Sequence, residues 1–130
     1  MKEDIEKVKK WLAKADEDLR AAEKLLLNNP EDVLLSIGFH CQQATEKYLK
    51  AFLTYHKVIF LFTHDLETLC QECSLIDKDF SHFGFKDLTD FAVVFRYNEI
   101  EETNLKEIKE YLEIARSVKH FVRNKINLEK

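Results

Sequence analysis

The sequence predicts an all-α domain, a five-helix antiparallel up-and-down bundle. Apolar residues recur every three or four positions along three long segments, which is the spacing of one face of an α-helix. Only two glycines and one proline occur in 130 residues, so the turns that many short strands need are scarce. A chain of this length with 45% hydrophobic residues and no linker or internal repeat is expected to form a single domain over residues 1–130.

The first two expected helices cover residues 2–28 and about 30–56. In the first, apolar positions run in steps of three and four from Ile5 to Leu26, which is a heptad-like stripe. Pro30 ends this helix, because proline disfavours helical backbone in the residue before it. Residues 30–32 are an acidic start for the second helix, whose apolar stripe runs from Leu34 to Phe52.

Three further helices are expected in the second half of the chain. Thr63 is the expected N-cap of a short helix over about 64–73, and residues 74–84 are interpreted as a loop or a single turn. A fourth helix is expected over about 86–96, and Asn104 is expected to cap a last long helix that ends near residue 126. The apolar run 58–62 could pass for a strand, but a lone strand has nothing to pair with, so it is expected to pack on the core as a connector.

Composition excludes several classes of function. The net charge of −4 does not mark the chain as a nucleic-acid binder, and no apolar run approaches membrane-spanning length. Three cysteines without a secretory signal favour a cytoplasmic location. Cys70 and Cys73 have the spacing of a metal pair, but apolar helix positions surround them. They are therefore interpreted as core thiols, and no metal or cofactor is expected.

A polar stripe on the otherwise apolar second helix is the first candidate site. Gln43, Glu46, Lys47 and Lys50 are three or four residues apart and therefore share one helix face. Polar groups beside an apolar seam need partners from another helix, a second subunit or a ligand. His64 either takes part in capping the next helix or points into a polar cleft near the fourth helix.

Basic residues in the second half of the chain form the other candidate sites. Arg96 and Tyr97 close the expected fourth helix, where an arginine suits the helix dipole and a guanidinium beside an aromatic ring also suits phosphate and base recognition. Arg116 and His120 lie one turn apart in the last helix. They either bind phosphate and move a proton in RNA cleavage or belong to an exposed basic stripe.

Several large apolar residues fall outside the expected core stripes. A symmetric dimer interface would bury them, and the alternative is that they widen the core of the bundle. They are Trp11, Leu25, Leu27, Leu35, Phe39, Phe83 and Phe121.

The chain resembles a HEPN domain, a small helical family found in prokaryotic nucleotidyltransferase-associated proteins. Residues 15–23, 39–50, 63–66 and 95–97 carry the resemblance, which extends in order over about residues 5–121. It implies a five-helix bundle that commonly forms homodimers. It also implies a role in nucleotide or RNA chemistry beside a minimal nucleotidyltransferase, often as a toxin–antitoxin pair.

Other members of this family are metal-independent ribonucleases that use an arginine, then four to six residues, then a histidine. Here no histidine follows Arg96 in that window, and only three residues separate Arg116 from His120. The sequence therefore favours a non-catalytic homodimeric module that works with a minimal nucleotidyltransferase and contacts nucleotide phosphates through Lys47, Lys50 and Arg96. One alternative is a ribonuclease that uses Arg96 or Arg116 with His64 or His120, and another is a purely structural dimerisation scaffold.

Overall fold

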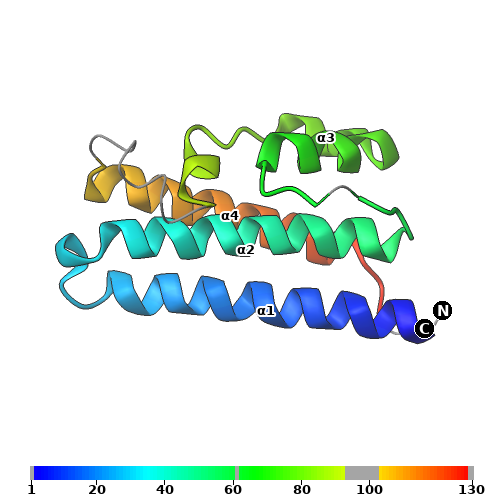
Figure 1. Cartoon of the computed structure of the whole chain (residues 1–130), viewed down its shortest axis with the longest axis horizontal. Helices are drawn as coiled ribbons and strands as arrows, with labels where there is room; N and C mark the ends of the chain where they lie inside the picture. The colour runs from blue at the N-terminus through cyan, green and yellow to red at the C-terminus, as the bar shows by residue number, and fades with distance from the viewer. Residues whose placement is uncertain (1, 61, 93–102, 129–130) are drawn as a thin grey trace.

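The computed structural model describes residues 2–60, 62–92 and 103–128, which form an all-helical bundle (Figure 1). The α-helices of these residues are α1 (Lys2–Leu26), α2 (Leu34–Tyr55), α3 (Leu66–Ile76) and α4 (Leu105–Lys125). Short 3₁₀ helices connect them: η1 (Pro30–Asp32), η2 (Lys78–His82) and η3 (Leu88–Ala92). The expected all-α class is confirmed, with four α-helices in the described residues where five were expected.

Helix α2 lies at the centre of the bundle. It packs against α1, α3, α4 and η3, and Figure 1 shows α1 antiparallel to it and α4 running in the same direction. Of its 22 residues, 13 are buried. A helix enclosed in this way has almost no solvent face, so each polar side chain on it must find its partner within the protein.

Two of the expected helix starts can be compared with the structure directly. The Asn104 cap is confirmed, because its side-chain oxygen accepts a hydrogen bond from the backbone N–H of Glu107 at 2.9 Å. The expected Thr63 cap is wrong: α3 begins two residues later than expected, with Asp65 as N-cap. The Thr63 hydroxyl instead accepts a hydrogen bond from the Asp65 backbone N–H at 3.1 Å, which fixes the turn before the helix.

The second half of the chain is less regular than its apolar pattern predicts. The expected fourth helix contains η3 in its described part. Lys86 has a left-handed backbone with φ of 51°, which prevents an α-helix from starting there. The expected loop over 74–84 holds the end of α3 and all of η2. The connector after α2 has no strand in its described residues, and Val58 and Phe60 pack against the core as expected.

Most of the apolar residues outside the stripes widen the core. Five of the seven pack against it: Trp11, Leu25, Leu35, Phe83 and Phe121. Leu27 is 85% exposed at the end of the first helix. The other large apolar side chains that are exposed in the described residues were not in the expected set: Ile59, Phe62, Leu75 and Ile76. A dimer interface therefore stays a prediction, and the residues first named for it are mainly core.

Candidate functional site

A charged cluster lies between α2 and the segment that leads into α3. It consists of Gln42, Glu46 and Lys50, which are four residues apart and share one stripe of α2, together with His64. Glu46 is 3% exposed and Lys50 is 4% exposed. The His64 side chain is 41% exposed and is the outer member of the cluster.

The Glu46 carboxylate is the centre of this cluster. Its Oε2 accepts a hydrogen bond from Lys50 Nζ at 2.8 Å, and its Oε1 accepts one from Gln42 Nε2 at 3.1 Å. His64 Nδ1 lies 2.8 Å from the same Oε1, and Gln42 Nε2 also donates to the His64 backbone oxygen at 3.0 Å. The buried negative charge is thus matched by one buried cation and further hydrogen bonds, which are the conditions under which a buried ion pair is tolerated.

Three aromatic rings enclose the Lys50 ammonium. Its Nζ lies 5.5 Å from the ring centre of Trp11, 5.8 Å from that of Phe60 and 5.7 Å from that of Phe62. These distances allow cation–π attraction, and the rings also keep water away from the ion pair. The outer face of Phe62 is open to solvent, since this residue is 92% exposed, and its ring meets that of His64 edge-on at 5.8 Å.

A second ion-paired group joins α1 to the neighbouring face of α2. Asp18 Oδ2 accepts a hydrogen bond from Lys47 Nζ at 2.5 Å, and Asp18 Oδ1 lies 2.9 Å from His40 Nδ1. Gln43 links the two groups, because its Nε2 donates to the Gln42 side-chain oxygen at 2.7 Å. Lys47 and Lys50, which the sequence placed on one stripe, therefore face different carboxylates.

Asp18 makes the stability of the fold depend on pH. Burial alone would raise the pKa of this carboxyl, but the hydrogen bonds from His40 and Lys47 and the charge of Lys47 outweigh it and hold the pKa below its usual value. A carboxyl of this kind contributes stability that is present above the unfolded pKa, near about 4, and is lost as the pH falls through the lower folded pKa.

We expect Asp18→Asn to lower the free energy of unfolding by about 1.5 kcal/mol at neutral pH, because it removes a charge-assisted pair from a largely buried position. The variant should also lose less stability than wild type between about pH 5 and pH 2. Urea unfolding at a series of pH values measures both effects. Glu17→Gln, at the exposed neighbouring position, is the matched control. An unchanged acid dependence in Asp18→Asn would contradict the assignment.

The Arg116 and His120 pair does not present a free guanidinium. Arg116 donates to Glu23 Oε2 from Nη2 at 2.8 Å and from Nε at 3.0 Å, and to Glu113 Oε1 from Nη1 at 2.6 Å. His120 Nε2 lies 3.2 Å from Asn124 Nδ2. Three further bases in the second half of α4 are also paired with carboxylates: Lys119 and Arg123 with Asp16, and Lys125 with Asp77 and Asp79. The basic half of α4 thus holds α4 against α1 and η2.

The three cysteines are buried free thiols, as expected for Cys70 and Cys73. Burial raises the pKa of Cys41 to about 12 and that of Cys70 to about 11, and it raises the pKa of Cys73 as well. These thiols stay protonated at neutral pH and are poor nucleophiles. Within the described ranges, no three potential metal-ligating side chains lie close enough to hold an ion.

The structure brings together only part of the set that the sequence proposed. Glu46, Lys50 and His64 meet directly, and Gln43 joins them through Gln42, whereas Arg96 and Tyr97 lie outside the described residues. Sequence reasoning missed Gln42, although its spacing of four from Glu46 could have revealed it. It also missed the covering rings and the Asp18 pair, which no spacing along one helix could reveal: Asp18, His40, Trp11, Phe60 and Phe62.

Comparisons with known proteins agree on one family. The model of the HEPN domain matches residues 8–125. The crystal structure of ST0689, an archaeal HEPN homologue, matches with a TM-score of 0.65 and 17% sequence identity, over 92% of this chain and 98% of that one. At this identity the structural similarity concerns the fold. No curated protein matched the chain. Across the residues that the structure describes, no helix is both long and apolar enough to cross a membrane.

Proposed function

Because the chain belongs to the HEPN domain family, we propose that it is a non-catalytic binding module that acts as a homodimer with a minimal nucleotidyltransferase. Family members are often associated with nucleotidyltransferases, which supports this choice of partner. The observation that carries the proposal is a pair of exposed apolar side chains, Ile59 and Phe62, on the connector whose Phe62 ring borders a charged cluster with its charges already paired. We call Ile59, Phe62 and His64 the loop surface.

The loop surface has the composition of a protein-binding site. Ile59 is 98% exposed and Phe62 is 92% exposed, and both belong to the short connector between α2 and α3. Exposed apolar side chains that lie close together mark interaction sites, and aromatic residues are enriched at the centres of interfaces. The partly exposed imidazole of His64 adds a polar contact at the edge.

The state of the lysines favours a protein partner over a free nucleotide. Lys50 is buried, paired with Glu46 and enclosed by rings, so a phosphate would have to replace a carboxylate that is already bonded. Lys47 is more accessible, with 21% of its side chain exposed, but it is paired with Asp18. Arg116, one of the two arginines considered for phosphate binding in the ribonuclease alternative, is held by Glu23 and Glu113.

The loop surface can be tested by removing its apolar side chains. We expect the double variant Ile59→Ser/Phe62→Ser to weaken binding to a minimal nucleotidyltransferase encoded in the same genome by at least about tenfold, since central aromatic contacts dominate interface energies. Isothermal titration calorimetry measures the affinity. Leu27→Ser is the matched control, because Leu27 is 85% exposed at the far end of α1.

Each part of the proposal has its own contradicting outcome. Unchanged affinity in the double variant would reject the loop surface as the binding site. A monomeric mass for the wild-type chain in light scattering would reject the homodimer. A titration with ATP tests nucleotide binding separately. Saturable ATP binding that weakens in Lys47→Ala, with Lys14→Ala as an exposed control on α1, would assign nucleotide recognition to the α1–α2 face instead.

A further inference from the structure

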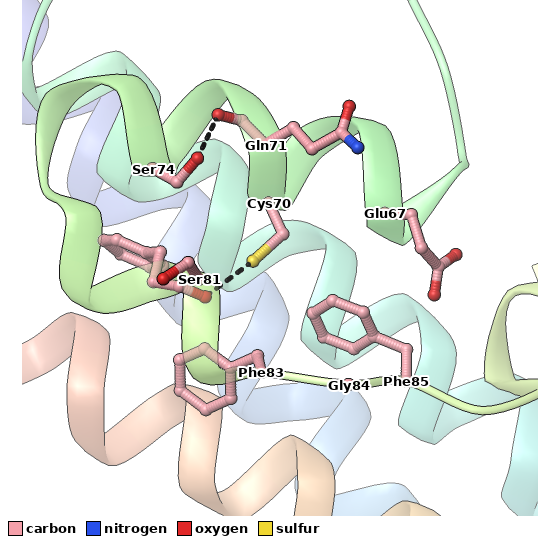
Figure 2. Close-up of a pocket in the computed structure, with 9 residues that line it drawn as sticks. Glu67, Cys70, Gln71, Ser74, Ser81, Phe83, Gly84 and Phe85 are labelled. Carbon is pink, nitrogen blue, oxygen red and sulfur yellow. Dashed lines mark hydrogen bonds between the residues drawn. The ribbon is translucent and has the colours of Figure 1, made fainter.

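A pocket of about 240 Å³ lies beside α3 (Figure 2). None of its lining residues belongs to the loop surface. Helix α3 forms one wall with Glu67, Cys70, Gln71 and Ser74. The chain from Phe80 to Phe85 forms the opposite wall (Figure 2). Neither the charged cluster nor the proposed partner surface contributes to this lining, so the pocket needs its own explanation.

The wall opposite α3 is aromatic. Phe80 is fully buried and Phe85 is 2% exposed, so both are fixed in the core. The rings of Phe83 and Phe85 are nearly parallel, with an interplanar angle of 23° and ring centres 6.3 Å apart. The buried Phe85 thus supports the partly exposed Phe83 ring, which offers a preformed surface to another planar apolar group; such groups bind aromatic walls by stacking or edge contacts.

The charge at the pocket is negative. Glu67 Oε1 accepts a hydrogen bond from Thr89 Oγ1 at 3.0 Å, and the Asp65 carboxyl lies close to the same side chain. Burial raises the pKa of Glu67 and the neighbouring Asp65 carboxyl raises it further, while the hydrogen bond from Thr89 partly opposes them. Among the described residues that line the pocket, Glu67 is the one charged side chain and none is cationic. A cation entering the pocket would supply the missing counter-charge.

The thiol in the wall is not a reactive group. Cys70 Sγ donates a hydrogen bond to the Phe80 backbone oxygen at 3.3 Å, as Figure 2 shows, and burial raises the pKa of this thiol to about 11. A protonated thiol with a backbone partner acts as part of an apolar wall. The pocket therefore suits reversible binding.

We propose that this pocket binds a small aromatic amine, with its ring against Phe83 and its ammonium group at Glu67. The volume is slightly below the range of about 300–1,000 Å³ that is usual for drug-sized ligands, so it suits a ligand with a single ring system. The aromatic walls also attract cations, which adds to the preference for a protonated amine.

Three compounds of one shape but different charge test the proposal. Phenethylamine is the cationic probe, 2-phenylethanol is neutral and 3-phenylpropionate is anionic. In amide NMR spectra of the full chain, phenethylamine should give saturable shifts at residues 67–74 and 80–85, with a dissociation constant on the order of 1 mM. The neutral probe should bind about two- to fivefold more weakly, and the anion more weakly still.

Two variants separate this site from non-specific attraction to an acidic chain. Glu67→Gln should weaken phenethylamine binding about two- to fivefold, whereas Glu31→Gln, which removes the same charge in η1 from a residue that does not line the pocket, should not. Ser74→Trp should abolish the shifts by filling the pocket from the α3 side. Equal binding of the amine and the acid, an unaffected Glu67→Gln variant, or no saturable shift with about 10 mM amine would overturn the proposal.

Discussion

Lys50→Met should lower the free energy of unfolding by about 3 kcal/mol, although methionine keeps most of the apolar length of the side chain. The reason is the carboxylate that remains. Glu46 is 3% exposed, and Lys50 supplies its one buried cation at 2.8 Å. Removing one member of a buried pair leaves the other charge without compensation, which costs more than the pair itself contributes. Urea denaturation at neutral pH measures the change.

A second substitution distinguishes this explanation from simple loss of packing. In Glu46→Gln/Lys50→Met the uncompensated charge is gone, so the double variant should be more stable than Lys50→Met alone. Lys47→Met is the matched control on the same helix, and it should cost no more than about 1 kcal/mol, because Lys47 and its partner are nearer to solvent. Equal costs for Lys50→Met and Lys47→Met would contradict the buried-pair account.

The polar stripe on α2 shows what helix periodicity can and cannot predict about side-chain contacts. Spacing placed Glu46, Lys47 and Lys50 on one face, and Glu46 and Lys50 do pair there, one turn apart on α2. It could not predict that Lys50 points under the aromatic connector while Lys47 meets Asp18 on α1, because both outcomes depend on chain segments that are distant in sequence. The interpretation of these lysines as equivalent phosphate ligands therefore does not follow from their shared stripe.

The long helices of the fold were predictable from their apolar spacing, whereas the short segments between them were not. Helices α1, α2 and α4 carry long apolar stripes, and their observed ends lie within a few residues of those expected. The chain between α3 and α4 is rich in phenylalanine, and its apolar spacing fits a helix. Within the described part of the expected fourth helix, residues 86–92, the left-handed backbone at Lys86 and the packing of Phe91 against α2 produce η3 instead of an α-helix. Tertiary packing outweighs local preference in such short segments.

Gly38→Ala should destabilise the protein by about 2 kcal/mol, although helix propensity alone would predict that the substitution stabilises it. In the interior of a helix such as α2, alanine is normally favoured over glycine by about 1 kcal/mol. Here a Cβ atom would lie 2.5 Å from Cδ1 and Cε1 of Phe91 and 3.1 Å from its Cγ. Phe91 is 1% exposed and packs edge-on against Tyr111, so its ring has little room to move. Thermal and urea unfolding would show the loss.

Gly84→Ala is the matched control, because a Cβ at that position meets nothing within 4 Å, and its effect should stay within about 0.5 kcal/mol. Gly38→Ala/Phe91→Leu tests the mechanism. If the clash with the ring is the cause, the double variant loses less stability than the sum of the two single variants. Additive losses would place the cause elsewhere in α2. Close approach of η3 to α2 at Gly38 then explains why the central helix of this bundle keeps a residue that its own propensity disfavours.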